Sequence, residues 1–563
     1  MSASSSLQTL SGDAALARGA REAGVRVVTG YPGSPSSGVL EALLETTRPE
    51  DVHVEWSTNE KVALEVAIGS SLAGGRALVC VKSVGMNVLV DPLMALNLTG
   101  VNAGLVILLG DDPGAYGSQN DQDTRPLASF AEIPLVEPST PAAGREMMAA
   151  AFELSERFRT AVIVRETRSF SRAEGDVPTG SGTPPPPRLS LPREPGRFVP
   201  YPRNAVAMHR ELHEKLERLG DWAETSPWNV AAGRGRRGII TAGFVDAKLR
   251  DVIGDGGGDG GDDGGGDDDG GDGGGEGAPD GGPRRLRLGT LYPLPERLVT
   301  DFLAGCDEVL VLEENEPFVE TQVREVAHRH GVAVPVRGKL TGHVAREGEL
   351  YRWQIQEALA GYLDRFTPRR AFTAAGEPDE RPFRKDHCAG CPYLHIVELL
   401  EEVGRELGGD PVLVGDPGCV VQAAERLAAK YALGSAAAIV QGMRRAGLPE
   451  RPVAVFGDSS FFHTGLPALI NAIHNETPVL LVVLDNSATV TSGFQPNPGS
   501  GRGARGGAAP RLSIEAIAGA CGVSFVRTLG PEASDDELRH AFREGLALDD
   551  HGLIVIRKPC EKT

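Results

Sequence analysis

Two polar strand ends are the first candidates for chemistry. An apolar run ends in Gly457-Asp458-Ser459, and a second apolar run ends in Asp485-Asn486, with 26 residues between Ser459 and Asn486. Ligands bind where parallel strands end at the carboxyl edge of a sheet. An Asp and an Asn at such an edge, with a nearby backbone carbonyl, offer the hard oxygen ligands that suit octahedral Mg²⁺. The pattern favours a site for Mg²⁺ and phosphate oxygens, although two ordinary strand ends with turn residues would have the same sequence.

Four cysteines are the second candidate. Cys388 and Cys391 form a CxxC within HCAGCPYLH, Cys419 follows in GDPGC, and Cys560 lies in the closing IRKPCEKT. A single CxxC is compatible with zinc, a redox disulfide or an iron–sulfur cluster. No second CxxC accompanies it, which disfavours a zinc ribbon. A CxxC with two distant cysteines can ligate a [4Fe–4S] cluster if the fold brings the four side chains together.

Glu60 is the third candidate. It begins an Ala-rich stretch in VEWSTNEKVALEVAIGSSLAG, just before an apolar run. The stretch predicts a helix with Glu60 in its first turn. Taken alone, a carboxylate there is most simply one that the helix dipole stabilises.

Short apolar runs separated by amphipathic stretches would position these residues. Near-continuous apolar runs are typical of parallel strands that are buried on both faces. The stretches FVETQVREVAHRHG and LPALINAIHNE have the periodicity of helices. The sequence therefore predicts an α/β fold with parallel sheets. The expected strands begin near Ala77, Leu105, Ala161, Gly238, Glu308, Pro411, Pro452, Pro478 and Leu553.

Breaks in composition divide the chain into three expected domains. A length of 563 residues is enough for about three or four domains. The stretch 176–202 is rich in Pro and Gly and is expected to be a linker. A second break precedes the CxxC. The expected domains are 1–175, 203–366 and 375–563.

The acidic charge is concentrated in one segment. The formal net charge is −20, which argues against nucleic acid or an anionic membrane surface as a partner. Half of it lies in the Gly/Asp run 254–282, which holds nine Asp, one Glu and no basic residue. We expect this run to be a disordered insert in the middle domain. The sequence shows neither a secretory signal nor an apolar run long enough to span a bilayer, so a cytoplasmic location is expected.

Several segments together resemble one family. In this order and over almost the whole chain, they resemble the alpha subunit of the indolepyruvate ferredoxin oxidoreductases, a branch of the thiamine diphosphate-dependent 2-oxoacid:ferredoxin oxidoreductases. The segments are YPGSPSS, EWSTNEKVALEVA, DPLM, DDPGAYGSQNDQDTR, YPLPERL, CAGCP, the block from GDSSFFHTG to LDNSATVTSGFQPNPG, and IRKPC. The spacing of the last large block is similar to the thiamine diphosphate motif, from which Ser459 and Asp485 depart at positions that are not metal ligands.

The resemblance implies three thiamine-fold domains. The first would be the pyrimidine-binding domain, the middle one a transketolase C-terminal-like domain and the third the diphosphate-binding domain. It also changes the interpretation of Glu60, which matches the glutamate that activates the cofactor by protonating its aminopyrimidine ring.

The resemblance further implies roles for individual residues. Ser34 would lie near the thiazolium and substrate, Arg125 would meet the substrate carboxylate, and His463 would line the pocket. The expected ligands of the diphosphate and Mg²⁺ are Asp458, Asn486 and the carbonyl of Ala488, with Gly457 and Ser459 beside them. The expected ligands of one [4Fe–4S] cluster are Cys388, Cys391, Cys419 and Cys560.

The implied activity is the oxidative decarboxylation of an aryl or branched 2-oxoacid to an acyl-coenzyme A. Electrons would pass through the cluster to ferredoxin or a similar acceptor, and a smaller beta subunit would complete an α₂β₂ complex. Many relatives continue past the PC segment into a ferredoxin-like tail, whereas this sequence ends at Thr563, so one cluster is expected. Tyr393 stands where the commoner CPGCPHR has His, which leaves the substrate range open.

Two alternatives remain open at this stage. A non-oxidative thiamine-dependent decarboxylase would keep Glu60, Asp458 and Asn486 but would need no cysteines. A catalytically idle structural subunit of a larger complex would need none of these groups for turnover.

Overall fold

The computed structural model describes residues 6–179, 189–191, 196–254, 282–377, 388–560 and 562. The chain divides into two compact units. The first comprises Met1–Thr29, Ser34–His53 and Leu64–Arg384, and the second comprises Gly30–Gly33, Val54–Ala63 and Lys385–Thr563. Apart from its two end residues, the insert expected at 254–282 lies outside the described residues.

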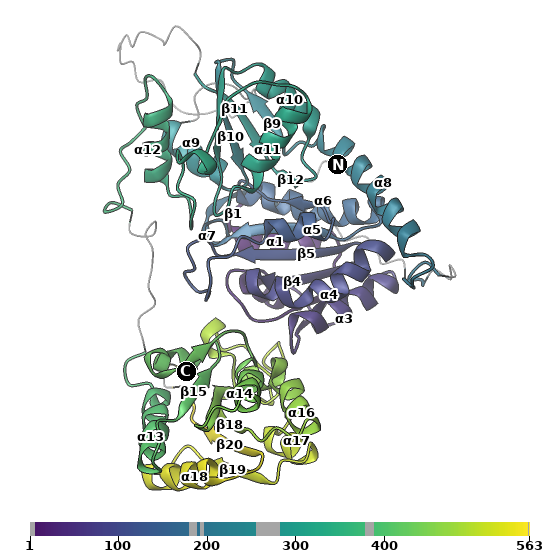
Figure 1. Cartoon of the computed structure of the whole chain (residues 1–563). Helices are drawn as coiled ribbons and strands as arrows, with labels where there is room; N and C mark the ends of the chain where they lie inside the picture. Colours follow the sequence, from purple (N-terminus) through teal and green to yellow (C-terminus); the bar gives the residue numbers. More distant parts are fainter. Residues whose placement is uncertain are drawn as a thin grey trace. The chain divides into compact units, whose positions relative to one another are not determined.

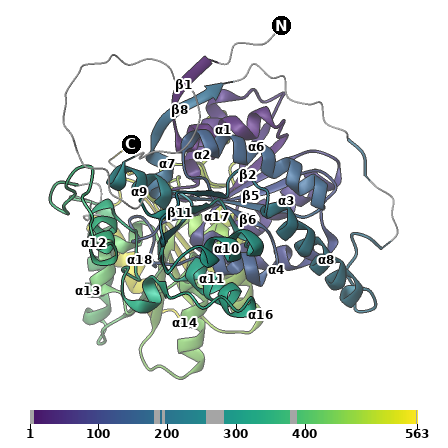
Figure 2. The same ribbon diagram turned by 90° about the horizontal axis from the view of Figure 1, so that it is seen from above.

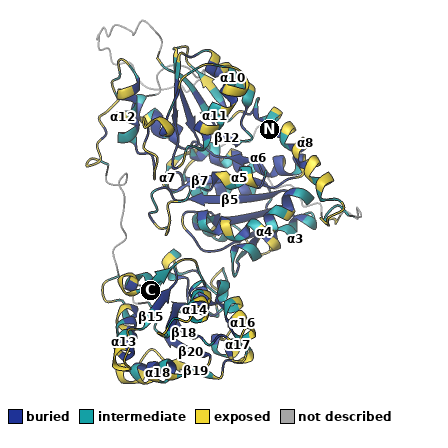
Figure 3. Ribbon diagram, viewed as in Figure 1, coloured by how far each residue is buried: buried dark blue, intermediate teal, exposed yellow. Residues whose placement is uncertain are grey.

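A seven-stranded sheet lies in the first unit (Figure 1). Strands β4, β5, β7 and β6 run parallel, and β12 is added antiparallel at the edge. Figure 3 shows that β5 and β7 are buried along their length, as their apolar sequences require. The sheet order is β12 (Thr290–Tyr292), β6 (Leu135–Val136), β7 (Val162–Thr167), β5 (Leu105–Asp111), β4 (Ala77–Lys82), β2 (Val27–Gly30) and β3 (His53–Trp56). The helices along this part of the chain are α1 (Gly12–Glu22), α2 (Ser37–Thr46), α3 (Glu60–Leu72), α4 (Ser83–Thr99), α5 (Arg125–Phe130), α6 (Pro141–Phe158) and α7 (Arg168–Arg172).

A five-stranded sheet completes the first unit. Four of its strands are parallel, and β9 is antiparallel at the edge. The order is β14 (Val336–Arg337), β13 (Glu308–Leu312), β10 (Arg237–Ala242), β11 (Arg284–Leu288) and β9 (Val230–Ala232). The helices are α8 (Ala205–Ala223), α9 (Val245–Ile253), α10 (Glu296–Ala304), α11 (Phe318–Arg329) and α12 (Arg352–Tyr362), with a 3₁₀ turn at Lys339–Thr341.

The second unit contains a six-stranded sheet in which every pair is parallel. The order is β16 (Ala429–Lys430), β15 (Val412–Gly415), β17 (Pro452–Gly457), β18 (Leu480–Asp485), β20 (Gly552–Arg557) and β19 (Phe525–Leu529). The helices are α13 (Pro392–Glu406), α14 (Ala436–Arg445), α15 (Asp458–Ser460), α16 (Leu466–His474), α17 (Ile514–Ala520) and α18 (Asp535–Ala547). A π-turn covers Phe461–Gly465, and 3₁₀ turns cover Cys419–Arg426 and Val490–Ser492.

The predicted α/β class is confirmed, and all nine expected runs form strands. One difference concerns the expected linker, whose first residues belong to β8 (Glu174–Thr179). This strand pairs antiparallel with β1 (Ser6–Ser11), and Figure 2 shows the two strands side by side. Residues 180–188 and 192–195 of the expected linker lie outside the described residues. None of the described helices combines the length and apolar composition needed to cross a bilayer.

A buried pair of carboxyl groups joins α1 to β7. Burial, reinforced by the charge of Glu41, raises the pKa of Asp13 to about 7 against the opposing effect of a hydrogen bond with Glu166. Burial and the charge of Asp13 raise the pKa of Glu166 well above its ordinary value. By distance, neither oxygen of Glu166 has a hydrogen-bond partner among the described residues. Burial therefore favours the protonated form of both carboxyl groups.

This pair predicts a pH dependence of stability. Because the pKa of Asp13 is higher in the folded than in the unfolded chain, its stabilising contribution is complete below the unfolded value of about 3.8 and is lost as the pH rises through about 7. We expect the urea midpoint of the first unfolding transition to fall between about pH 4 and pH 7. Asp13→Asn should reduce that fall, because the amide does not ionise. Asp51→Asn, at an exposed ion pair with Arg48, is the control and should keep the parent slope; an equally steep slope in Asp13→Asn would contradict the raised pKa of Asp13.

Candidate functional site

Three neighbouring strands of the second unit end in acidic or amide residues. Asp416 follows β15, Asp458 follows β17, and Asp485 ends β18 with Asn486 directly after it. Strand β17 lies between the other two, so the carboxyl ends of all three meet at one edge of the sheet. The sequence predicted Asp458 and Asn486 but not Asp416.

Asp458 is held in a polar network beneath this edge. Its Oδ2 accepts a hydrogen bond of 2.8 Å from Nδ2 of Asn497, which also donates to Oγ of Ser459 at 3.1 Å. Ser459 in turn contacts Oγ1 of Thr489 at 2.9 Å. Burial, followed by the charge of Asp485, raises the pKa of Asp458 to about 7. A cation near Asp458 would offset both effects.

Asn486 lies in a tight turn after β18. Its Oδ1 accepts from the backbone N–H of Ala488 at 3.3 Å, and Ser487 between them has a positive φ of 58°. The turn brings the Asn486 side chain and the Ala488 backbone to the strand end adjacent to Asp458. The oxygen donors of this set fit Mg²⁺.

Glu60, Tyr31 and His463 form a buried group within the second unit. Oε2 of Glu60 lies 2.8 Å from Nε2 of His463, and both side chains are almost wholly buried. The ring of Tyr31 meets that of His463 edge to face, with centroids 4.7 Å apart. Burial, then the charges of Glu60, Asp458 and Asp416, raise the pKa of Tyr31 well above its ordinary value. The structure thus brings the predicted Glu60 and His463 into direct contact.

The π-turn explains the position of His463. A π-turn adds a residue to the helical repeat and is frequent at functional sites. Here it covers Phe461–Gly465 and separates α15 from α16. Asn59, which precedes Glu60, donates to the carbonyl oxygen of His463 at 3.1 Å. The backbone and the side chain of His463 are therefore both held by the segment that carries Glu60.

A small hollow of the second unit lies beside these groups. The phenol oxygen of Tyr31 is buried without a hydrogen-bond partner among the described residues, which leaves it a donor for a ligand. The lining residues are Tyr31, Pro32, Ser57, Thr58, Ser459, Phe462, Thr489, Pro496, Asn497 and Pro498.

The four predicted cysteines lie close enough to affect one another electrostatically. Burial raises the pKa of Cys419 to about 12, and the charges of Cys391, Cys560, Asp458 and Cys388 add to the effect. The CxxC loop is tied to the Cys419 turn, because the backbone N–H of Cys388 donates to Oε1 of Gln422 at 2.6 Å. Side chains from three distant segments are thus brought together.

The spacing of the sulfurs argues against a small ion. A zinc tetrahedron with Zn–S bonds of about 2.3 Å holds its sulfurs about 3.8 Å apart. Among the described residues, no three of these cysteines have sulfurs within 4.8 Å of one another. The described sulfurs are therefore not placed as a single zinc ion would hold them.

Buried charge is balanced differently in the two units. In the first unit, Arg165 pairs with Asp111 and Glu137, and Lys248 pairs with Glu314 and Glu349. In the described part of the second unit, the buried acidic residues are Glu60, Asp416, Asp458 and Asp485, and no Lys or Arg is buried. Since a buried carboxylate needs a positive partner, this edge is suited to bound cations.

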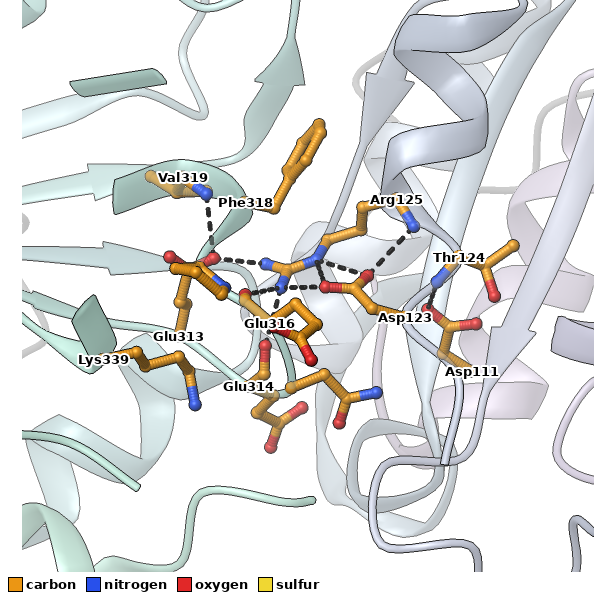
Figure 4. Close-up of polar contacts among 12 residues, drawn as sticks. Asp111, Asp123, Thr124, Arg125, Glu313, Glu314, Glu316, Phe318, Val319 and Lys339 are labelled. Atoms are coloured by element: carbon orange, nitrogen blue, oxygen red, sulfur yellow. Dashed lines mark hydrogen bonds and ion pairs between the residues drawn. The ribbon is translucent and has the colours of Figure 1, made fainter. Parts of the chain in front are cut away.

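Arg125 lies in the first unit, and acidic side chains already compensate its positive charge (Figure 4). Its guanidinium pairs with Asp123 at 2.6 Å and with Glu313 at 2.7 Å. It also donates to the carbonyl oxygens of Glu314 and Glu316. Asp123 and Arg125 are almost inaccessible, and Glu313 is fully buried. These contacts favour a structural role for Arg125 over the expected contact with a substrate carboxylate.

Ser34 lies in the loop between β2 and α2 of the first unit, where its side chain is exposed. Three further polar residues of the site were not predicted. Asp416, Asn497 and Tyr31 each lie in a quoted segment, namely GDPGC, the block that ends in QPNPG, and YPGSPSS, but none of the three was singled out.

Comparisons with known proteins identify both thiamine-binding parts. Residues 427–557 match the family model "Thiamine pyrophosphate enzyme, C-terminal TPP binding domain". Residues 18–170 match "Pyruvate flavodoxin/ferredoxin oxidoreductase, thiamine diP-bdg". Among similar curated proteins is indolepyruvate oxidoreductase subunit IorA of Methanothermobacter marburgensis, 36% identical over 98% of this chain and 86% of the relative. The chain belongs to this family.

Other relatives agree with this membership. The IorA subunit of Archaeoglobus fulgidus is 34% identical over 98% of this chain and 86% of the relative, and that of Thermococcus kodakarensis is 34% identical over 98% and 85%. A solved 2-oxoglutarate:ferredoxin oxidoreductase from Magnetococcus marinus has 14% identity and a TM-score of 0.44 over 59% of this chain and 61% of that one. The predicted family and the predicted enzyme class, a 2-oxoacid ferredoxin oxidoreductase, are confirmed.

The network around Arg125 leads to a prediction. Arg125→Met should lower the free energy of unfolding by about 3–5 kcal/mol, because it leaves Asp123 and Glu313 buried without a counter-charge. Arg346→Met is the control, since Arg346 forms an exposed pair with Glu316, and should cost less than about 1 kcal/mol. Chemical denaturation of both variants measures the difference. If Arg125→Met instead raised KM for the 2-oxoacid at unchanged stability, Arg125 would be a substrate contact.

Proposed function

We propose that this chain is the thiamine diphosphate-bearing subunit of an oxidoreductase that decarboxylates an aryl or branched 2-oxoacid of the indolepyruvate kind. One [4Fe–4S] cluster held by Cys388, Cys391, Cys419 and Cys560 would carry electrons to ferredoxin or a similar acceptor. Coenzyme A would take the acyl group. A beta subunit would complete a complex of two alpha and two beta chains.

One contact carries this proposal. Nδ2 of Asn486, the expected Mg²⁺ ligand, lies 3.8 Å from Sγ of Cys419, an expected cluster ligand. A cofactor site and a cluster site that share neighbouring residues would keep the distance for electron transfer short. A non-oxidative decarboxylase has no use for four cysteines at this place.

Each residue of the proposed site has its own role in binding or activating the cofactor. Asp458, Asn486 and the carbonyl of Ala488 would hold Mg²⁺ and with it the diphosphate, with Gly457 and Ser459 at the same strand end. Thiamine diphosphate, when bound, supplies the carbanion chemistry that removes carbon dioxide from a 2-oxoacid. Glu60 would hold a proton for the aminopyrimidine ring of the cofactor.

The neighbours of Glu60 would control that proton. His463 contacts Oε2 of Glu60, so it fixes the orientation of the carboxyl group. Tyr31 covers the imidazole from the side and helps to exclude water. The hydroxyl of Tyr31, still without a partner among the described groups, would donate to a group bound in the hollow. Ser34, which follows Tyr31-Pro32-Gly33 in the sequence, is the residue proposed to lie near the thiazolium and the substrate.

Glu60→Gln tests the role of the carboxyl group. We expect 2-oxoacid-dependent dye reduction to fall by roughly 10²–10⁴-fold, because the amide cannot exchange a proton with the cofactor. Thiamine diphosphate should still bind, as measured by titration calorimetry. Glu65→Gln, on the exposed part of the same helix, is the control and should keep parental activity. Full activity in Glu60→Gln would exclude the assigned role and favour an idle subunit.

Cys391→Ser tests the redox assignment. Anaerobically purified parent protein should contain about four irons per chain, and the variant should lose iron together with reduction of a viologen dye. Thiamine diphosphate binding should remain, since Asp458 and Asn486 are unchanged. Cys521→Ser, at a half-buried cysteine outside the group of four, should keep both iron and activity. Iron-free protein that reduces the dye at the parental rate would refute the proposed electron route.

A further inference from the structure

A group of three side chains in the first unit has the composition of a metal site. Among the described residues, Glu132, His209 and His213 are the one set of three or more His, Cys, Asp or Glu whose ligand atoms all lie within 4.8 Å of one another. The group belongs neither to the thiamine site nor to the four cysteines. His209 and His213 are exposed at the surface, and Glu132 is partly buried beside them.

Helix α8 aligns the two histidines. His209 and His213 are four residues apart and therefore lie on the same face of the helix. Their rings are 4.4 Å apart. Figures 1 and 3 show α8 along the outside of the first unit, with much of its length exposed. An ion from solvent can reach this face directly.

Glu132 approaches from the turn that follows α5. It has a left-handed backbone with φ of 54°, and the turn is held by hydrogen bonds from Ala131 to Leu127 and from Ile133 to Ala128. Its Oε2 lies 2.8 Å from Nε2 of His209, and its Oε1 lies 3.0 Å from Nε2 of His213. The charge of Glu132 is close enough to Tyr292 to add to the effect of burial, and together they raise the pKa of that phenol to about 12.

We propose that Glu132, His209 and His213 bind a divalent transition-metal ion of the zinc type. Zinc bonds of about 2.0–2.2 Å to nitrogen and oxygen place neighbouring ligand atoms about 3.3–3.6 Å apart in a tetrahedron. The two Nε2–O separations are only a few tenths of an ångström shorter, so a small rotation of the carboxylate admits the ion. Imidazole ligands favour zinc, copper or nickel over magnesium or calcium. A water molecule from the open side would complete the coordination.

An ion pair and a metal ion demand different protonation states of the same three groups. With one protonated and one neutral imidazole, both rings donate an N–H to Glu132 and the charges balance. A divalent ion instead binds the lone pairs of two neutral imidazoles and the carboxylate, so metal binding releases protons. Zinc titration distinguishes the two states.

The ion would fasten α8 to the seven-stranded sheet. The C-terminal part of the helix already lies there, because Leu219, Trp222 and Ala223 line one small hollow together with Val136 and Tyr292. Helix α8 is the first element after the expected linker and leads into the five-stranded sheet. A metal bridge from α8 to the turn before β6 would therefore stabilise the joint between the two sheets of the first unit.

Zinc titration of the holoprotein tests this proposal without reference to activity. The protein is prepared anaerobically with thiamine diphosphate, excess Mg²⁺ and its cluster, so that those sites are filled. Calorimetry with zinc chloride should show one site per chain, and saturation should raise the unfolding temperature by about 2 °C or more. His209→Ala and His213→Ala should each weaken binding by roughly tenfold or more and remove the rise.

His330→Ala provides the matched control. His330 pairs with Glu296 at the surface and belongs to no group of three close metal-ligating side chains in the described part of the chain, so this variant should bind zinc like the parent. Without zinc, His209→Ala should unfold at the parental temperature within about 2 °C, which separates metal binding from folding. Zinc binding that is equal in the parent and in His209→Ala, or absent from the parent at millimolar zinc, would overturn the proposal. Loss of thiamine or cluster activity in Glu60→Gln or Cys391→Ser leaves this result unaffected.

Discussion

Buried negative charge is the constraint on which the site depends. Moving a carboxylate out of water is costly unless a positive group accompanies it. The first unit supplies such groups from its own chain, with Arg125, Arg165 and Lys248 inside the protein. The edge of the six-stranded sheet has no buried Lys or Arg among its described residues, and the partly exposed Arg557 pairs with Asp485 at 3.2 Å and with Glu515. If cations bind there as proposed, cofactor binding would also stabilise the second unit.

The sequence predicts the central strands well because their apolar runs depend on burial alone. The segment LRLGTLYP has a feature that the burial of apolar runs does not predict. It forms two strands in two different sheets, β11 and β12, divided at Gly289. The backbone N–H groups of Gly289 and Thr290 both donate to Oδ1 of Asn229, and a side chain at 289 would meet Trp228 at 2.6 Å. This change of sheet depends on a tertiary contact with a residue about sixty positions earlier, which no local pattern records.

Some residues of the candidate site were likewise recognisable from the local sequence, and others were not. Asp458, Asn486 and the CxxC were recognisable because strand ends and ligand spacing are local features, and Glu60 was recognisable only through the family resemblance. Asn497 and Asp416 could not be predicted, since their partners lie far away in sequence. The buried ion pairs of Arg125 were not foreseeable for a related reason, because Glu313, which pairs with it, is almost two hundred residues later.

A chain of contacts connects the strand-end acids to the pair of Glu60 and His463. Asp416 accepts from the backbone N–H groups of Gly434 and Ala436. Gly434 has a positive φ, and a Cβ there would meet Oγ1 of Thr464 at 2.1 Å, so only glycine allows this loop to approach the π-turn. Thr464 donates to the carbonyl oxygen of Leu433 and fixes the residue next to His463. His463 also lowers the pKa of Asp416 against the larger effect of burial. The contact between Glu60 and His463 is thereby linked to the strand end that precedes Cys419.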